Sequence, residues 1–252
     1  MNTYTVEVIK NECICRDTYE MVLTTPGGFF EGFKPGQFVH LEIPNRNELI
    51  LRRPISVHKA NETEITLIYK VLGKGTEQLS TLKLHDKINI LGPIGTGFPL
   101  LQEFESIALI GGGLGCAPLL SVPAFDSARE YHAFLGFSDK EAMYKTSEME
   151  LLCEDCHVAT DDGSFGYKGN TVQLFKEYLD NGGKADAVFA CGPVPMMKGL
   201  KQLNLDIPLY LSLEERMGCG YGACLTCVCN GNKGFKRVCV DGPVFAAEEV
   251  EL

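Results

Sequence analysis

The sequence has no tryptophan and no long run of apolar residues. Its apolar stretches, such as residues 107–110, are far shorter than the roughly 20 residues that a helix needs to cross a bilayer, which argues against a membrane-spanning helix. The polar beginning MNTYTVEVIKNEC lacks the apolar segment of a signal peptide. We therefore expect a cytoplasmic protein.

Positive charge is also scarce. The chain has 23 lysine and arginine residues against 33 aspartate and glutamate residues, for a formal net charge of -10. This charge repels nucleic acid and anionic lipid, so we expect neither a nucleic acid nor a membrane as a partner. Any phosphate-bearing ligand must therefore be held by a local motif.

Cysteine, in contrast, is abundant. The 252 residues include 11 cysteines, and cytosolic thiols stay reduced, which favours metal or redox chemistry over disulfides. The last 34 residues hold five of them, Cys219, Cys224, Cys227, Cys229 and Cys239. This end of the chain is predicted to be a separate functional unit.

The pattern along the chain predicts a multi-domain α+β protein. Between residues 3 and 95, six short β-rich runs separated by turn residues predict an antiparallel six-stranded β-barrel in a domain of residues 1–100. Strand-like runs then alternate with helical spacing, which predicts a doubly wound parallel α/β nucleotide domain at 101–208. Residues 209–252 form a small cysteine-rich domain.

The most specific motif is C-x4-C-x2-C-x11-C, formed by Cys219, Cys224, Cys227 and Cys239. A close triplet with a distant fourth cysteine is the plant-type [2Fe-2S] spacing. A structural zinc site is the alternative, but zinc sites favour paired C-x2-C units and these four cysteines contain only one. Cys229 is a spare thiol, and its exchange with one of the four ligands stays an open alternative.

Two weaker motifs point to phosphate binding. Arg53 lies on the fourth β-rich run, where its guanidinium group is suited to grip a pyrophosphate, and the turn at Gly75-Thr76 adds backbone N–H groups and a hydroxyl. The alternative is a surface salt bridge and an ordinary hairpin turn.

Gly111–Gly115 follow a strand, with Pro118 in the first helical turn, so the helix that begins there is able to receive a pyrophosphate. Cys191-Gly192-Pro193 follow a second strand, at the edge where α/β sheets bind ligands. For Cys191 alone, inert packing is the alternative.

Two other features are assigned no site. Cys153-x-x-Cys156-His157 matches the attachment motif of c-type haem, but that haem is attached after export, so packing or surface cysteines are predicted. Glu214-Glu215 is interpreted as solvated charge beside the cysteine-rich segment.

In this order the motifs resemble the ferredoxin-NADP reductase superfamily. LRRPIS, LIYKVLGKGT, EERMGCGYGACLTCVC and RVCVDGPVFAAEEV resemble more closely the electron-transfer subunits of NAD-linked, B-type dihydroorotate dehydrogenases. The resemblance implies FAD in the barrel, NAD on the α/β domain and a C-terminal [2Fe-2S] cluster.

The resemblance also implies residue roles. It implies FAD binding by Arg53, Pro54, Ile55, Ser56, Ile68, Tyr69, Lys70, Gly75 and Thr76. It implies an NAD site bordered by Gly111, Gly112, Gly113, Leu114, Gly115, Cys191, Gly192 and Pro193, and a cluster on Cys219, Cys224, Cys227 and Cys239. Ser56 would lie near the flavin N5 and Cys191 near the nicotinamide, as catalytic groups or as groups that act by shape alone.

Two residues bear on how the flavin is stacked and on which nicotinamide nucleotide is preferred. Many relatives have an aromatic residue where Ile55 stands, so stacking on the isoalloxazine is expected to be weak or to come from Tyr69. Asp139 follows a strand where a carboxylate favours NAD over NADP, although Lys140 weakens that argument.

The implied activity is that of an oxidoreductase subunit in pyrimidine (UMP) biosynthesis. Dihydroorotate is oxidised at FMN in a partner catalytic subunit, and electrons pass through [2Fe-2S] and FAD to NAD+. FAD is required because it converts between single electrons and a hydride. The implied assembly is a heterotetramer with two copies of each subunit.

The sequence leaves two alternatives open. One is the small subunit of another flavin and iron–sulfur reductase, such as an NADH-dependent ferredoxin:NADP oxidoreductase or a sulfhydrogenase. The other is a redox sensor that binds cluster and nucleotide without turnover. The tail motifs favour the dihydroorotate partner.

Overall fold

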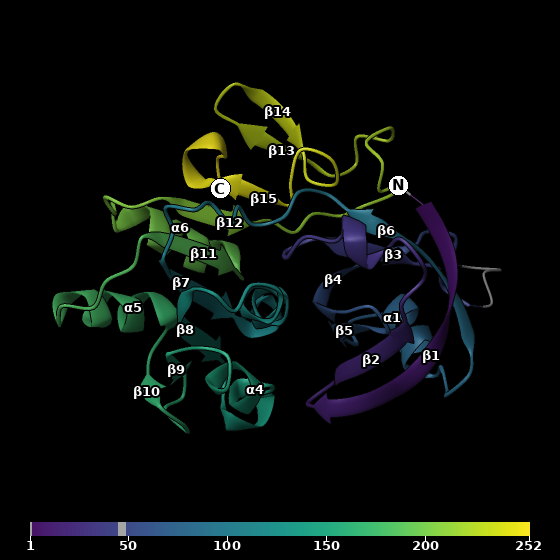
Figure 1. The fold of residues 1–252 in the computed structure, drawn as a ribbon, viewed down its shortest axis with the longest axis horizontal. Helices are drawn as coiled ribbons and strands as arrows, with labels where there is room; N and C mark the ends of the chain where they lie inside the picture. The colour runs from purple at the N-terminus through teal and green to yellow at the C-terminus, as the bar shows by residue number, and fades with distance from the viewer. Residues whose placement is uncertain (1, 45–48) are drawn as a thin grey trace.

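The computed structural model describes residues 2–44 and 49–252 (Figure 1). Residues 1 and 45–48 of the predicted first domain lie outside the described residues. Figure 1 shows a barrel on the right of the view, an α/β layer structure on the left, and the C-terminal hairpin above the junction between them. No helix in the described part of the chain is long and apolar enough to span a membrane.

Six strands close an antiparallel barrel in the order β1-β2-β5-β4-β3-β6, as the sequence predicts. They are β1 (Asn2–Cys15), β2 (Thr18–Thr24), β3 (Phe38–Leu41), β4 (Arg53–Ala60), β5 (Glu64–Lys70) and β6 (Lys87–Ile94). A short 3-10 helix η1 (Phe30–Gly32) precedes β3, and helix α1 (Lys74–Ser80) follows β5.

Alternation along β5 gives that strand two different faces. Ile65, Leu67 and Tyr69 are fully buried in the barrel core, whereas Ile68 points outward and packs into the core of the α/β domain. A strand places successive side chains on opposite faces, so one strand serves two cores. The outer face of β5 thereby becomes part of the junction between the domains.

The α/β domain is built on a seven-stranded sheet in the order β10-β9-β8-β7-β11-β12-β15. Its strands are β7 (Ser106–Gly112), β8 (Glu130–Phe137), β9 (Asp155–Thr160), β10 (Tyr167–Lys168), β11 (Ala187–Cys191), β12 (Leu209–Ser212) and β15 (Val244–Ala246). All pairings are parallel except that of β12 with β15. β7 and β11 lie side by side near the centre, and their apolar runs are buried on both faces.

Short helices cover the faces of this sheet. They are α2 (Cys116–Leu119), α3 (Ser121–Phe125), α4 (Thr146–Glu150), α5 (Thr171–Asp180) and α6 (Val194–Gln202), with 3-10 turns η2 (Gly113–Gly115), η3 (Lys140–Ala142) and η4 (Ala247–Glu249). The spacing of Val172, Phe175 and Leu179 correctly predicts α5, which begins at a capping box between Asn170 and Gln173.

The C-terminal region contributes to two different parts of the fold. Its strands β12 and β15 extend the nucleotide-domain sheet, while β13 (Val228–Gly231) and β14 (Gly234–Arg237) form a separate hairpin. Lys201 on α6 donates to the carbonyl oxygens of Ala247 and Val250 and so holds the end of the chain against the sheet. The cysteine-rich segment is thereby fixed to the α/β domain at both of its ends.

A network of charged groups joins the barrel to the α/β domain. Lys145 lies 2.5 Å from Glu20 on β2 and 3.1 Å from Glu148 on α4, and Lys59 on β4 also pairs with Glu148. Contacts with His58, Lys145 and Lys59 hold the pKa of the Glu148 carboxyl well below its usual range. Since these groups are half-buried, they fix the relative position of the two domains more firmly than surface pairs would.

Candidate functional site

A cavity of about 220 Å³ opens between the barrel and the α/β domain. Eight of the nine predicted FAD residues line it, namely Arg53, Pro54, Ile55, Ser56, Ile68, Tyr69, Lys70 and Thr76. The ninth, Gly75, packs directly against the Arg53 guanidinium group. The structure therefore brings all nine to one place, where β4, β5 and α1 meet.

The two neighbouring arginines of the LRRPIS motif have different surroundings. Arg52 pairs with Glu42 at 2.9 Å and donates to Asn89, so it is part of the barrel. Arg53 donates to the carbonyl oxygen of Leu51, and no carboxylate among the described residues pairs with it. Arg53 thus presents its guanidinium group at the cavity wall, where a pyrophosphate would provide the missing anionic partner.

No aromatic ring from position 55 or 69 is available to stack on a flavin, because Ile55 is aliphatic and the Tyr69 ring is engaged elsewhere. The Tyr69 ring is fully buried, stacks on Tyr19 with ring centroids 5.7 Å apart, and donates its hydroxyl to Asn11 at 2.9 Å. Stacking by Tyr69 on a ligand would require the ring to leave both partners. The Thr76 hydroxyl is also engaged within its own turn, because it donates to Gly73 and accepts from the Leu72 amide.

The two predicted NAD motifs lie side by side at the carboxyl ends of β7 and β11. Cys191 pairs in register with Gly111, and a Cβ atom on Gly115 would lie 2.3 Å from the Cys191 carbonyl oxygen. Only glycine fits this approach. The hydroxyl of the buried Tyr144 donates to the carbonyl oxygens of Gly113 and Leu114 and anchors the loop.

The glycine loop also adjoins the flavin-type cavity. Leu114 from the loop and Ala117 from α2 line the cavity together with the barrel residues. His58 on β4 fixes this arrangement, since its Nδ1 lies 2.7 Å from the Ala117 carbonyl oxygen and must donate to it. The edge of the sheet where open α/β folds bind ligands is therefore placed directly against the barrel.

The two candidate catalytic residues differ in accessibility. Ser56 lines the cavity, whereas Cys191 is fully buried and is not among the lining residues. Burial raises the pKa of the Cys191 thiol well above its usual value. Cys191 is therefore a neutral thiol. Such a group is suited to shaping a site and is a poor nucleophile.

Sequence reasoning missed one whole wall of the cavity. Ser212, Leu213, Glu214, Glu215 and Met217 line it, as does Phe38. Both glutamates are exposed, which agrees with their interpretation as solvated charge, but they also line the cavity. Desolvation by the surrounding protein raises the pKa of the Glu214 carboxyl. The only available signal was their position immediately before the first cysteine of the motif.

The four motif cysteines lie in two pairs. The Cys219 amide donates to Cys224 Sγ and the Cys224 amide donates to Cys219 Sγ, both at 3.4 Å. Cys227 and Cys239 are buried next to each other, and burial together with the neighbouring Cys227 raises the pKa of the Cys239 thiol to about 12. Hydrogen bonds from Thr226 and Cys219 lower the pKa of the exposed Cys224 thiol to about 6.

Two pairs of thiols fit a two-iron cluster, in which each iron takes two thiolates. Among the described residues, no three His, Cys, Asp or Glu side chains gather around one point, as a single metal ion would require. Backbone N–H groups directed at sulfur, including that of Tyr221 at 3.5 Å from Cys219 Sγ, suit an anionic cluster. The paired thiols and the N–H groups directed at them therefore agree with the [2Fe-2S] prediction.

The remaining cysteines lie outside these pairs. Cys229 is half-buried on β13, and within residues 2–44 and 49–252 its thiol hydrogen-bonds to none of the four. Cys153 and Cys156 pack at the edge of the α/β core, and burial raises the pKa of both thiols to about 12. This agrees with the prediction that they are packing residues.

Asp139, the residue expected to favour NAD, is already engaged. Its carboxylate accepts hydrogen bonds from Ser138, from the amides of Glu141 and Ala142, and from Arg16 at 2.9 Å. It caps η3 and pairs with the barrel, so it presents no free oxygen to a ribose. The contacts of Asp139 therefore do not support the expectation that its carboxylate selects NAD over NADP.

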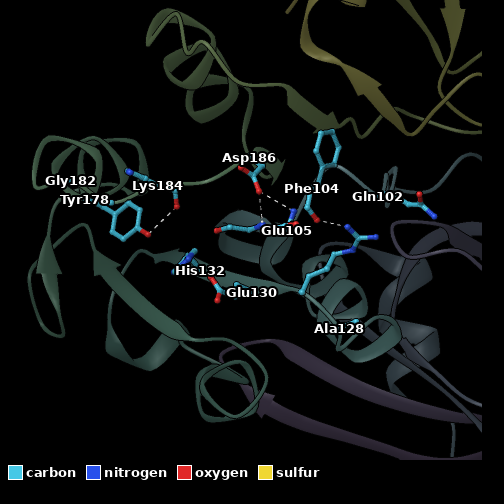
Figure 2. A pocket seen from close by; sticks show the side chains of 13 residues that line it. Gln102, Phe104, Glu105, Ala128, Glu130, His132, Tyr178, Gly182, Lys184 and Asp186 are labelled. Carbon is cyan, nitrogen blue, oxygen red and sulfur yellow. Dashed lines mark hydrogen bonds between the residues drawn. The ribbon is translucent and has the colours of Figure 1, made fainter.

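A larger hollow lies at the other end of the parallel strands, near the amino ends of β7, β8 and β11 (Figure 2). None of the predicted site residues lines it. Its polar groups are largely occupied by the fold: Asp186 accepts from the Glu105 and Ser106 amides, and Tyr178 donates to the Lys184 carbonyl oxygen. It shows no arrangement suited to chemistry.

A lined cavity on a closed barrel, a glycine loop on a parallel sheet and paired cysteines define an oxidoreductase of the ferredoxin reductase type. The structure of an NADH-dependent reduced ferredoxin-NADP oxidoreductase is similar, with a TM-score of 0.86 and 29% identity over 98% of this chain and 89% of that one. A ferredoxin NADP+ reductase from Neisseria gonorrhoeae shares the fold, with a TM-score of 0.67 and 18% identity over 81% and 91%.

Sequence comparison defines the family more narrowly. The oxidoreductase FAD-binding domain family matches residues 5–98, and the iron-sulfur cluster binding domain of dihydroorotate dehydrogenase B matches residues 214–251. The dihydroorotate dehydrogenase B (NAD(+)) electron transfer subunit of Enterococcus faecalis is 44% identical over 87% of both chains, and that of a Geobacillus species is 41% identical over 97% of both. The chain belongs to the family of dihydroorotate dehydrogenase B electron transfer subunits.

Replacing one motif cysteine tests the pairing directly. We expect Cys224→Ser to lose most of its iron and acid-labile sulfide, because one iron would keep a single thiolate, while the flavin site in the barrel survives. Cys229→Ser is the matched control and should keep the iron content of the unaltered chain. Unchanged iron in Cys224→Ser, or loss of iron in Cys229→Ser, would show that the ligand set is wrong.

Replacing the arginine at the cavity wall tests the flavin site. We expect Arg53→Ala to weaken FAD binding by about 2 kcal/mol, or roughly thirtyfold, through loss of charge-assisted hydrogen bonds. Arg53→Lys should be intermediate, since lysine keeps the charge but not the planar fork. Fluorescence titration of the flavin-free protein measures the dissociation constant, and an unchanged value in Arg53→Ala would exclude this role.

Proposed function

We propose that this chain is the electron transfer subunit of a B-type dihydroorotate dehydrogenase and links dihydroorotate oxidation in a partner subunit to NAD+ reduction, as part of pyrimidine (UMP) biosynthesis. One structural observation carries most weight. The segment from Ser212 to Met217 closes the flavin-type cavity and leads within two residues to Cys219. The proposed flavin and cluster sites would therefore be adjacent, as electron transfer between them requires.

The residues are proposed to act in three groups. The cavity residues on β4, β5 and α1 would hold FAD, with Arg53 at its pyrophosphate. The four paired cysteines would hold the cluster, and Gly111–Gly115 with Cys191, Gly192 and Pro193 would border NAD. In functional terms the chain divides into an FAD-binding part (1–100), an NAD-binding part (101–208) and a cluster part (209–252).

Electron and hydride transfer would require the cavity residues to orient the flavin and exclude water. When bound, FAD exchanges single electrons with an iron–sulfur centre and a hydride with a nicotinamide. Ser56 at the cavity wall would orient the reactive edge of the flavin, and buried Cys191 would shape the floor of the nicotinamide site without being ionised. The apolar wall made by Leu114, Ala117 and Leu213 would exclude water from the hydride path.

The proposed partner is an FMN-containing catalytic subunit that oxidises dihydroorotate. This proposal is supported by family membership, since the relatives are named electron transfer subunits of that dehydrogenase. We propose a cytoplasmic heterotetramer with two copies of each subunit. The net charge of -10 speaks against nucleic acid or anionic membranes as further partners.

Another flavin and iron–sulfur reductase is a second candidate, because the NADH-dependent reduced ferredoxin-NADP oxidoreductase structure superposes with a TM-score of 0.86. The fold and cofactors would be the same and the partner would differ. A redox sensor without turnover is the third candidate. Steady NADH oxidation with an artificial one-electron acceptor would exclude the sensor.

Co-expression with a dihydroorotate-oxidising FMN subunit tests the proposed partner. We expect the two chains to co-purify and to form orotate and NADH together, whereas the catalytic subunit alone should not reduce NAD+. Size-exclusion chromatography with light scattering gives the stoichiometry. A stable chain with bound FAD and iron that neither co-purifies nor supports NAD+ reduction would contradict this partner and favour the ferredoxin-linked alternative.

A further inference from the structure

His40 is a buried residue to which the sequence motifs assign no role. It lies on β3, is fully buried, and neither ring nitrogen has a hydrogen-bond partner among the described residues. A buried polar group without a partner costs about 1–3 kcal/mol, so such groups in native proteins usually have a partner. The imidazole therefore indicates a polar partner that the described part of the polypeptide does not supply.

The direction of the ring follows from the two faces of β3. Val39 and Leu41 point into the barrel core, so Phe38 and His40 point outward, toward the C-terminal segment. A Cβ atom on Gly220 would lie 3.0 Å from both Nδ1 and Cε1 of His40. Gly220 has a φ of +77°, and the cysteine loop passes so close to the imidazole that only glycine fits there.

The ring also contacts a residue of the cavity wall. Phe38 lines that cavity, packs in one apolar cluster with Cys227 and Cys239, and has its ring centroid 5.6 Å from that of His40. His40 therefore lies between the wall of the cavity and the loop that carries the cysteines.

The imidazole is a neutral donor. Burial, together with the positive charge of Arg52, lowers the pKa of His40 to about 4, so near neutral pH one ring nitrogen carries a proton and the other a lone pair. The Phe38 ring beside it has no polar atom, and no described residue supplies a partner for either ring nitrogen. A cluster held by the adjacent loop would supply anionic sulfur acceptors for this N–H group.

We propose that His40 donates a ring N–H to a sulfur of the [2Fe-2S] cluster and thereby raises the reduction potential of that cluster. The donor stabilises the reduced cluster more, because reduction adds negative charge to the sulfurs. His40 would thus act directly on the cluster, from a position beside the wall of the proposed flavin site. This inference rests on the proposed function, because it requires the cluster to be present.

A spectroscopic test needs no substitution. The protein is produced with 15N-labelled histidine, its iron content is measured, and the dithionite-reduced cluster is examined by pulsed EPR. We expect a weak coupling between the electron spin and a single 15N nucleus. Absence of any 15N coupling in iron-loaded protein would overturn the proposal, and would favour a buried water as the partner of His40.

Substitution tests the effect on the potential. In His40→Leu we expect the ratio of reduced to oxidised cluster at a fixed potential to fall several-fold, up to about tenfold, which corresponds to 59 mV for a one-electron couple. His40→Gln supplies an amide donor and should recover part of the shift. His132→Leu removes a mostly buried imidazole on β8, at the opposite edge of the sheet, and should leave the potential unchanged.

The outcomes separate this inference from the proposed function. EPR-monitored redox titration of the iron-loaded chains gives each potential, and absorbance follows the flavin. Equal cluster potentials in His40→Leu and His132→Leu, with full iron content, would overturn the role of His40 and leave the proposed function intact. Failure of the unaltered chain to bind iron at all would instead contradict the cluster assignment.

Discussion

The segment between β12 and the first motif cysteine constrains the whole structure. It leaves the nucleotide-domain sheet at Ser212, closes the cavity beside β4 and β5, and continues directly into the loop with Cys219. A short, apolar path between redox centres requires that these sites be held close together without intervening solvent. One continuous segment meets this requirement, because it ends a sheet strand, lines the cavity and leads into the cysteine loop.

The rest of the fold holds this junction in place. The outer face of β5 packs into the α/β core through Ile68, and the outer face of β3 packs against the cysteine loop through Phe38 and His40. His58 fixes the first turn of α2 against β4. The half-buried charges around Glu148 hold the barrel and the α/β domain in a fixed relative position. The outer faces of barrel strands therefore contribute to sites that the α/β domain and the cysteine loop complete.

The sequence predicted what depends on local spacing. The barrel, the parallel sheet, helix α5 and the family all followed from period, turn residues and motif order, and the cavity lining includes eight of the nine residues expected to bind FAD. Spacing alone did not show that the four cysteines divide into two pairs. That division depends on how the loop folds back on the segment containing Cys239.

What the sequence did not predict depends on contacts between distant segments. Glu214 and Met217 line the cavity only because the C-terminal segment lies against barrel residues. His40 contacts Gly220, which is 180 positions away in the sequence. The sequence suggested Asp139 as a partner for a ribose, but Arg16 in the turn between β1 and β2 pairs with its carboxylate. No local pattern distinguishes such residues from ordinary surface or core positions.

An anaerobic titration of the purified protein with NADH tests the central claim most directly. Absorbance reports bleaching of the flavin, and EPR reports the reduced [2Fe-2S] cluster in the same sample. If flavin and cluster form one path on this chain, NADH should bleach the flavin and produce the EPR signal of the reduced cluster. A protein that contains both FAD and iron but shows neither change would contradict the account.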